Sequence, residues 1–305
     1  MLSITRGTRV LGSPLPAHHR LIVRDDEPPL RLPDTGRLPD TDRLPDTGRM
    51  TTDRMTPSDT TVLDDPVGAS LTSTHAHLAR SVGRAVAFHP DVASFCSVGT
   101  DPDPQSWNDL AQLLGPGEVA DLFDCPSAPP SDWEPVFSLD GVQMVATPTL
   151  ATPRLAAATA DAATTAGTDT TSRVVELGAD DVPEMLELVR RTAPGPFRPG
   201  THELGTYLGI RDGDTLVAMA GQRLRPPGWS EISAVCTAPE ARGRGHATRL
   251  ITQLAARTTA DGERPFLHAV ATNTGAIALY ERLGFTVRKR VTFRGYRIPD
   301  PQPGA

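Results

Sequence analysis

VCTAPEARGRGHATRL (residues 235–250) joins an apolar run to a loop rich in glycine and arginine, and then to a helical pattern. Gly243 and Gly245 let the backbone approach a ligand closely, because no Cβ stands in the way. The first turn of the following helix leaves several amides unpaired, and the helix dipole favours an anion there. Arg242 and Arg244 add charge that suits a pyrophosphate. The stretch therefore predicts a phosphate-binding loop, although a basic surface turn has the same composition.

The spacing within this loop excludes the two commonest phosphate-binding patterns. The loop has no Gly-Lys-Ser/Thr, so it is not a Walker A loop. The dinucleotide pattern Gly-x-Gly-x-x-Gly fails as well, because no third glycine follows. The pattern that remains is Arg-x-x-Gly-x-Ala, from Arg242 to Ala247, placed after a strand and at the start of a helix.

The composition limits the classes of function. A net charge of -7 and a pI near 5.6 argue against nucleic-acid binding driven by bulk electrostatics. Three widely separated cysteines imply no disulfide framework, and no cysteine or histidine cluster forms a four-ligand metal set. The N-terminal stretch lacks the apolar core of a signal peptide, and no apolar run is long enough to cross a bilayer. We therefore expect a soluble cytoplasmic protein with no metal and no nucleic-acid or membrane partner.

The N-terminal segment contains a short repeat. Residues 31–48 read RLPDTGRLPDTDRLPDTG. A unit this short, with proline and aspartate in each copy and a single leucine, cannot build a packed core. Two interpretations stay open: the repeats form a disordered tail, or they lie upstream of a true start at Met50 or Met55. In both cases residues 1–68 carry no predicted function.

The rest of the chain divides at residues 147–172, a segment of alanine, threonine, proline and aspartate that we predict to be a linker. Residues 69–146 predict a small α/β domain, with a short helix over 74–85. In that domain Asp140-Gly141 lies between two strand-like runs and indicates a hairpin. Residues 173–305 predict a second α/β domain.

The second domain has the clearer pattern. Asp212-Gly213 indicates a hairpin, and Gly284 is placed to end a helix over 274–283. Further strands are expected at 173–177, at SEISAVCT (230–237) and at PFLHAVA (265–271). The helix that follows the opening loop presents one apolar face, formed by Ala247, Leu250, Ile251 and Leu254.

A second motif completes the pattern begun by the loop. ATNTGAIALYERLGF (271–285) supplies an asparagine followed by Leu-Tyr-x-x-Leu-Gly-Phe. On these two motifs, residues 173–298 resemble the GNAT superfamily of N-acetyltransferases, in particular its glycine-N-acyltransferase-like branch. The resemblance implies a mixed, mostly antiparallel sheet flanked by helices and splayed at the acetyl-CoA site, with the smaller α/β domain before it. The residues leave open whether that first domain is a degenerate copy of the same fold.

The resemblance also implies which residues bind acetyl-CoA. The loop amides and Thr248 would hold the pyrophosphate, and the strand before the loop would pair with the pantetheine arm. A main-chain amide of that strand would also stabilise the oxyanion of the tetrahedral intermediate. The implied cofactor-binding set is Val235, Cys236, Thr237, Arg242, Gly243, Arg244, Gly245, His246, Ala247, Thr248 and Asn273, with no metal ion.

Tyr280 is implied as the general acid that protonates the departing thiolate. Core packing is the alternative for Tyr280, and helix capping is the alternative for Asn273. Cys236 is favoured as a small apolar residue over a nucleophile. For His268, a satisfied core histidine is favoured over a base.

Glu231 is the candidate general base. It lies in the strand before the loop, at a spacing that resembles the strand glutamate of histone-acetylating members of the superfamily. A carboxylate there would take a proton from an ammonium acceptor, directly or through water. The alternative is an ordinary charged residue at a strand start, facing solvent.

These observations predict an N-acetyltransferase that moves an acetyl group from acetyl-CoA to a primary amine by direct attack, without an acyl-enzyme. The partner is a small-molecule or peptide amine, and a homodimer is compatible with the sequence. Two alternatives stay open: a non-catalytic protein that senses acyl-CoA or binds a partner, and an acyltransferase using a longer acyl-CoA. Segments 194–207 and 223–229 are expected to set the acceptor, with Phe197, Arg198, Glu203 and Trp229 as pocket candidates that could equally anchor loops.

Overall fold

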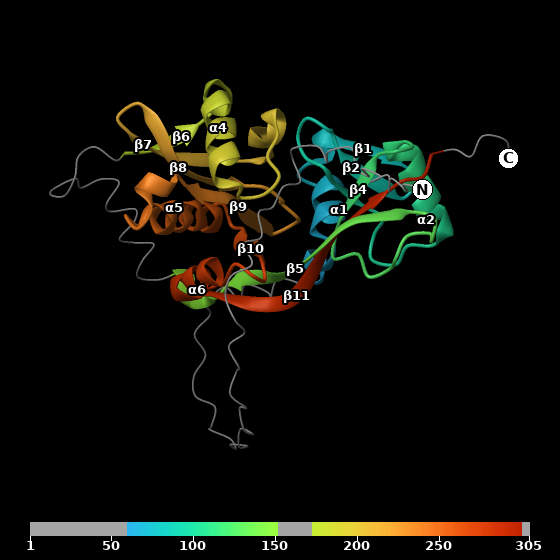
Figure 1. Ribbon diagram of the computed structural model, residues 1–305. Coiled ribbons are helices and arrows are strands. Elements are labelled where there is room, and N and C mark those ends of the chain that lie inside the picture. The colour runs from blue at the N-terminus through green and yellow to red at the C-terminus, as the bar shows by residue number, and fades with distance from the viewer. Residues whose placement is uncertain (1–59, 152–172, 301–305) are drawn as a thin grey trace, which may run out of the picture.

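The computed structural model describes residues 60–151, here called the first half, and residues 173–300, the second half (Figure 1). The RLPDTG repeats and most of the predicted 147–172 linker lie outside these ranges. The first half begins with the short helices η2 (Thr61–Asp64) and α1 (Pro66–Leu71), ahead of the domain start expected at residue 69.

The described residues form one sheet of 11 strands, in the order β1-β2-β3-β4-β11-β5-β10-β9-β8-β7-β6. The first half supplies β1 (Ala79–Val82), β2 (Ala85–Phe88), β3 (Phe95–Ser97), β4 (Val119–Phe123) and β5 (Glu134–Ala146). The second half supplies β6 (Val174–Leu177), β7 (Tyr207–Asp212), β8 (Thr215–Gln222), β9 (Trp229–Thr237), β10 (Arg264–Val270) and β11 (Phe285–Arg297).

The two halves repeat one topology. In the first half, β1, β2 and β3 are antiparallel neighbours, and β3 runs parallel to β4 with helix α2 (Pro104–Leu114) between them in the chain. In the second half, β7, β8 and β9 repeat this pattern, and β9 runs parallel to β10 with helix α5 (His246–Ala260) between them. The repeated strand order supports the view that the first half is a reduced copy of the second.

The last strand of each half is exchanged with the other half. β5 lies between β11 and β10 and pairs antiparallel with both. β11 pairs with β4, with Arg297 opposite Val119 and Phe293 opposite Phe123. In Figure 1 these two long strands run side by side from the α6 end of the molecule to the α2 end. Residues 147–172 therefore separate two sequence segments that share one sheet.

The hairpin predicted at Asp140-Gly141 is wrong, because β5 passes through this position as one strand of 13 residues. Asp140 and Gly141 pair with Thr292 and Val291 of β11, so the backbone stays extended. A Cβ at Gly141 would lie 2.6 Å from the Phe293 ring and 2.8 Å from a backbone carbonyl of β10. The glycine is thus required by close packing between strands and not by a turn.

The short helix predicted over 74–85 is also wrong. A 3-10 turn, η3 (Ala76–Leu78), leads into the β1–β2 hairpin, whose turn contains Gly83 at φ +53°. The Asp212-Gly213 hairpin is confirmed, because β7 pairs antiparallel with β8 and Gly213 has φ +59°. Gly284 ends helix α6 (Thr274–Leu283) at φ +99°, as predicted.

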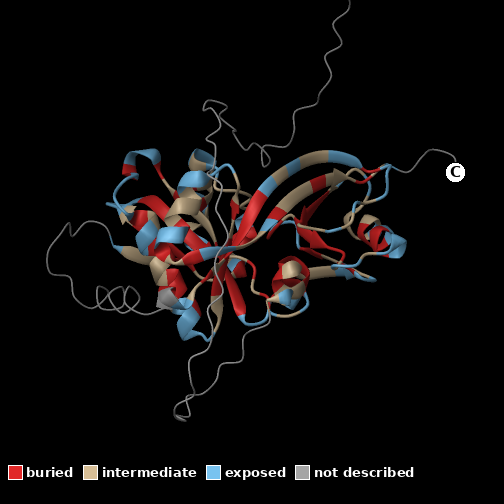
Figure 2. Cartoon of the chain, turned by 90° about the horizontal axis from the view of Figure 1, so that it is seen from below, coloured by how far each residue is buried: buried red, intermediate tan, exposed pale blue. Residues whose placement is uncertain are grey.

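Helices pack against the sheet through apolar faces. Helix α4 (Val182–Thr192) buries Met185 and Leu188, and α5 buries Leu250, Ile251, Leu254 and Ala255. The predicted apolar face of α5 is therefore confirmed, although Ala247 is only partly buried. Figure 2 shows the strands in the middle of the sheet as buried, and the outward faces of the helices as exposed.

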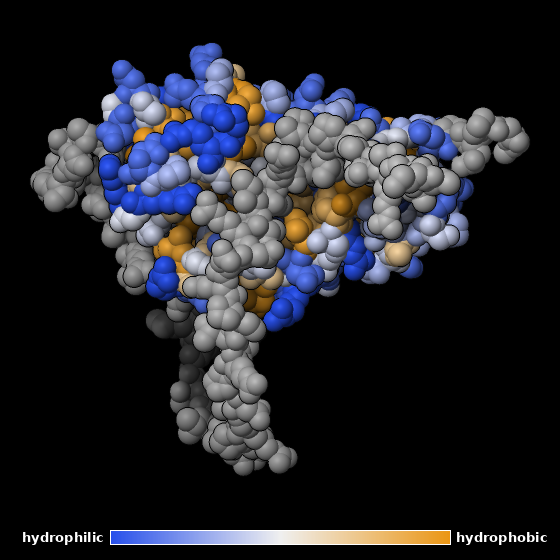
Figure 3. Space-filling model, viewed as in Figure 1, coloured by the Kyte–Doolittle hydropathy of each residue, from blue (hydrophilic) through white to orange (hydrophobic). Residues whose placement is uncertain are grey.

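Polar residues dominate the face of the molecule seen in Figure 3, where apolar side chains form small, scattered patches. Salt bridges such as Arg190–Glu187 on α4 and Arg257–Glu176 lie on the surface of the second half. Within the described ranges, no helix has the length and apolar character that crossing a membrane requires.

Candidate active site

The parallel pair β9–β10 diverges in the middle of the sheet. The two strands pair only where Trp229, Ser230 and Glu231 lie opposite Arg264, Pro265 and Phe266. Beyond this point β9 continues to pair with β8, whereas β10 continues to pair with β5. We call the region beyond the last pair the splay. The resemblance implies a sheet that is splayed at one place, and the structure shows that β9 and β10 separate.

A bulge in β9 lies at the start of the splay. Ala234 has φ +52°, a left-handed conformation that costs a non-glycine residue about 1–2 kcal/mol. The ladder with β8 is interrupted here, and in the described ladder neither Ala234 nor Val235 has a β8 partner. The bulge therefore leaves main-chain groups of β9 outside the ladder with β8.

The loop after β9 presents free amides at the start of α5. Gly243 and Gly245 have φ +77° and +78°, and Gly245 is the N-cap of α5, with no side-chain cap. The first intrahelical bond joins the Arg249 amide to the Gly245 carbonyl, so the amides of residues 246–248 lie outside the helix ladder. A Cβ built at Gly243 or Gly245 meets no atom within 4 Å, so the backbone here is open to a ligand.

The charge around this loop is positive. Burial and the positive charges of Arg244 and Arg249 lower the pKa of His246. Arg242 donates to the Thr237 carbonyl at 3.3 Å, and Arg244 Nη1 lies 3.5 Å from the Asp212 carboxylate. The side chains of Arg242, Arg244 and Arg249 are exposed at the surface. Free amides, a helix dipole and arginine side chains together fit a pyrophosphate.

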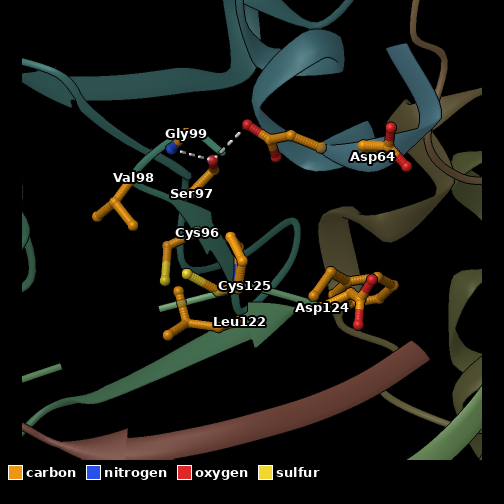
Figure 4. A pocket seen from close by; sticks show the side chains of 11 residues that line it. Asp64, Cys96, Ser97, Val98, Gly99, Leu122, Asp124 and Cys125 are labelled. Atoms are coloured by element: carbon orange, nitrogen blue, oxygen red, sulfur yellow. Dashed lines mark hydrogen bonds between the residues drawn. The ribbon is translucent and has the colours of Figure 1, made fainter. Parts of the chain in front are cut away.

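The equivalent helix start in the first half has its own acidic cap. At the start of α2, the Asp103 carboxylate accepts from the Ser106 amide at 2.8 Å and so occupies the position that a phosphate would take. At the carboxyl ends of β3 and β4, the cavity has a volume of only about 10 Å³ (Figure 4). Ser97 donates to Asp65 at 2.7 Å and accepts from the Gly99 amide at 2.9 Å, which ties α1 across this edge. The anion-binding geometry is therefore a property of the second half.

Asn273 and Tyr280 lie on α6, beside the end of β10. The Asn273 side chain accepts from the Ala276 amide at 3.2 Å and is the N-cap of α6, so its capping role is confirmed. Tyr280 is buried and packs edge-on against Phe285, with ring centroids 6.2 Å apart. Burial raises the pKa of Tyr280 to about 12, so the hydroxyl keeps its proton at neutral pH. Their contacts with a cofactor stay predictions.

Cys236 and three residues of the segments expected to set the acceptor are held by contacts with their neighbours. Burial raises the pKa of Cys236 to about 11, which agrees with a small apolar residue and not a nucleophile. Trp229 is fully buried beneath Arg264, whose guanidinium lies 4.2 Å from the ring centroid, so it anchors the core. Phe197 packs edge-on against Tyr207, and Arg198 donates to the Pro90 carbonyl of the first half at 2.8 Å.

Glu231 is fully buried at the last β9–β10 pair, so the alternative of a solvent-facing residue is wrong. Arg223 binds it through two bonds, from Nε to Oε2 at 2.8 Å and from Nη2 to Oε1 at 2.6 Å. The Leu224 amide donates to Oε2 at 3.3 Å. Burial alone would raise the pKa of this carboxyl, but the charge and hydrogen bonds of Arg223, and the bond from His268, lower it to about 2. The base role of Glu231 stays a prediction.

His268 follows on β10 and links Glu231 to the first half. Its Nδ1 lies 2.7 Å from Glu231 Oε1, and its Nε2 lies 3.1 Å from the amide nitrogen of Gln143 on β5. Gln143 also donates to the Leu63 carbonyl at 2.9 Å and accepts from Arg288 Nη1 at 2.9 Å. A continuous chain of hydrogen bonds thus runs from β11 to the splay.

The first half also forms a wall of this network. The guanidinium of Arg223 lies 5.0 Å from the ring centroid of Phe95 on β3 and 5.4 Å from that of Phe123 on β4. Such cation–π contacts are worth about 2 kcal/mol when the cation is desolvated. The residues that sequence reasoning missed are Arg223, Gln143 and Arg288, which stand in no motif and reach the site only through the tertiary fold. For His268, the expected core histidine with satisfied hydrogen bonds is confirmed, because both ring nitrogens have partners and the side chain is 4% exposed.

Comparisons with known proteins agree with this geometry. The model of the FR47-like protein family matches residues 207–294. A solved structure from Novosphingobium aromaticivorans, described as an acetyltransferase from the GNAT family, is 36% identical over 78% of this chain and 99% of its own, with a TM-score of 0.65. The chain belongs to the GNAT family of acetyltransferases. The match covers more of the chain than either half alone, so this relative has counterparts of both halves.

More distant solved structures have the same family name. A GCN5-related N-acetyltransferase from Kribbella flavida is 16% identical over 77% of this chain and 96% of its own, with a TM-score of 0.46. A similar protein from Streptococcus suis is 20% identical over 63% and 68%, with a TM-score of 0.40. No curated protein matches the chain. The glycine-N-acyltransferase-like branch stays a prediction. Among the described residues, no group of three His, Cys, Asp or Glu side chains is placed to hold a metal ion.

Proposed function

We propose that this GNAT protein transfers an acetyl group from acetyl-CoA to a primary amine by direct attack of the nitrogen on the thioester. The observation that carries the proposal is the combination of the splay with an open, positively charged helix N-terminus at its mouth. This arrangement provides an anion site and a free main-chain edge on consecutive segments, as a pyrophosphate followed by a pantetheine arm requires.

Each group of residues in the site has a separate role in the proposed reaction. The amides of residues 246–248, with Arg242 and Arg244, bind the pyrophosphate of acetyl-CoA. Main-chain groups of β9 near Val235 hold the pantetheine arm and polarise the thioester carbonyl. Tyr280, whose hydroxyl is protonated at neutral pH, delivers a proton to the departing sulfur.

A matched pair of glycine variants tests the donor site. Gly245 and Gly99 occupy equivalent loops of the two halves, have φ +78° and +80°, and have no atom within 4 Å of a built Cβ. Gly245→Ala and Gly99→Ala therefore carry a similar backbone strain of about 1–2 kcal/mol. We expect Gly245→Ala to weaken acetyl-CoA binding at least several-fold in calorimetry, and Gly99→Ala to leave it unchanged.

The same titration gives the stoichiometry, and the expected value is one acetyl-CoA per chain. Thiol release from acetyl-CoA is then measured with a panel of amino acids, polyamines, aminoglycosides and peptides. Absence of binding, or equal weakening by both glycine variants, would count against the donor assignment. Binding without thiol release for any amine would favour a sensor of acyl-CoA. Faster release from a longer acyl-CoA would reassign the donor.

A further inference from the structure

Glu231 is poorly placed to take a proton itself. Oε1 accepts from Arg223 Nη2 and His268 Nδ1, and Oε2 accepts from Arg223 Nε and the Leu224 amide. The side chain has no exposed surface, and that of Arg223 is only 12% exposed. A carboxylate that is fully hydrogen-bonded and paired with a buried arginine is a strong acceptor for a fixed partner and a weak base toward anything else.

The hydrogen bonds around His268 define which of its nitrogens carries the proton. Arg288 can only donate, so the oxygen of Gln143 faces Arg288 Nη1. The Leu63 carbonyl can only accept, so the amide nitrogen of Gln143 faces Leu63 and, with its second N–H, His268 Nε2. Nε2 must then be the acceptor, and Nδ1–H donates to Glu231. In this arrangement Nδ1 carries the N–H of the ring, and Nε2 carries its lone pair.

The surroundings of His268 are apolar on three sides. Phe123, Phe266 and Phe293 face its ring edge-on, with centroids 5.4, 5.7 and 5.8 Å away. The side chain is 4% exposed. The charged group in direct contact with His268 is Glu231 on β9, which is paired with Arg223. Arg288 on β11 reaches His268 only through Gln143, and Asp64 on η2 binds Arg288 and Lys289 at 2.9 Å.

The position of His268 in β10 places its ring at the start of the splay, with Nδ1 toward β9 and Nε2 toward Gln143 of β5. His268 follows Phe266, the last residue of β10 that pairs with β9, by two positions and stands on the same face of the strand. It is thus the first residue on that face of β10 within the splay. Glu231, which holds it, is the last residue of β9 before the splay.

We propose that His268 is the group that accepts the proton of the attacking amine, with Glu231 as a positioning residue that holds its ring. The proposal rests on the proposed acetyl transfer. The nitrogen of the acceptor replaces the Gln143 amide as the partner of Nε2. The N–C bond forms and the C–S bond breaks. The ammonium gives up two protons: one goes to His268 Nε2 and then to solvent, and the other replaces the proton that Tyr280 delivers to the sulfur.

The test compares His268→Gln with His89→Gln in the full-length protein, using acetyl-CoA and the fastest amine of the panel. We expect His268→Gln to lower kcat/KM by about 100-fold or more while acetyl-CoA affinity is unchanged, because general base catalysis contributes about 10²–10⁴-fold. The rise of kcat/KM with pH should also be flattened in this variant. His89→Gln makes the same change at an exposed histidine of the first half, outside this network, so its rate should equal that of wild type.

Three results would overturn the proposal. A folded His268→Gln protein with the wild-type rate and pH profile removes His268 from the reaction and leaves the transferase function standing. A folded His268→Gln protein whose lowered rate keeps the wild-type pH profile would show that the network acts only as structure. A wild-type protein that acetylates no amine of the panel overturns both this proposal and the proposed function.

Two further measurements keep the proposal testable if His268→Gln does not fold. Nitrogen NMR of the wild-type protein should show a neutral His268 protonated at Nδ1, and protonation at Nε2 would contradict the assignment. In His268→Ala, added imidazole should restore part of the acetyl transfer. No rescue in a folded variant that binds acetyl-CoA would also count against the proposal.

Discussion

Replacing Glu231 with Gln should destabilise the fold strongly and in a pH-dependent way. The variant leaves Arg223 buried beneath Phe95 and Phe123 without its counter-charge. The pKa of Glu231 falls from an ordinary 4.5 to about 2 in the folded chain, which corresponds to roughly 3 kcal/mol at about 1.4 kcal/mol per unit. Removing one partner of a buried pair costs a similar amount, about 3–5 kcal/mol. We therefore expect a loss of about 3 kcal/mol at pH 7.

The sign of the pH effect follows from the lowered pKa. A carboxyl that is more acidic when folded stabilises the fold fully above its unfolded pKa near 4.5, and loses this contribution as the pH falls toward about 2. The difference in unfolding free energy between wild type and Glu231→Gln should thus be largest near neutrality and shrink between pH 4.5 and 2. Urea denaturation followed by circular dichroism at several pH values measures it.

Two control variants test whether the loss of stability comes from leaving a buried charge unpaired. Glu187→Gln breaks the exposed pair with Arg190 on α4 and should change nothing measurable. Arg223→Met combined with Glu231→Leu removes both charges and should recover most of the lost stability, because an apolar pair of similar volume leaves no charge unpaired. A Glu231→Gln protein as stable as wild type at pH 7, or a difference that does not change with pH, would refute this account of the pair.

Two further outcomes are expected. Tyr280→Phe should lower kcat by about 100-fold with little change in acetyl-CoA affinity, as measured by steady-state kinetics and calorimetry, and an unchanged kcat would assign Tyr280 to packing alone. Phe123→Ala should lower the free energy of unfolding by about 3–5 kcal/mol in urea denaturation and should also reduce acetyl transfer, because this first-half residue covers both Arg223 and His268. The control is Val287→Ala, at a side chain that is 42% exposed, and it should change the free energy of unfolding by no more than about 0.5 kcal/mol.

The parts of the site that the sequence predicts are those whose residues are neighbours in the chain. Arg242 to Ala247 form a loop whose glycines and position before a helix already define its conformation. Asn273 caps the helix that it immediately precedes, and Gly213 and Gly284 act at the turn and the helix end where they stand. In each case the physical cause acts within a few residues, so a local sequence pattern is enough to predict the conformation.

The remaining parts depend on pairings between distant segments. Gln143 meets Leu63, His268 and Arg288 across separations of 80, 125 and 145 residues. Gly141 was misread because a glycine beside an aspartate has the same appearance whether a turn or a crowded strand requires it. Its true cause is the Phe293 ring, which lies 152 positions further along the chain. The exchange of β5 and β11 has no local signal, because the partners of each strand lie far away in the sequence.

The exchange of β5 and β11 constrains how the chain folds during synthesis. β4 is complete once residue 123 has been made, but its outer neighbour is β11, whose Arg297 pairs with Val119. Until residues 285–297 leave the ribosome, one edge of β4 and one edge of β5 stay unpaired, and unpaired strand edges favour association with other chains. Contacts this distant in sequence also form slowly. We therefore expect the nascent chain to depend on chaperones for most of its length, and to become resistant to proteases late and in one step.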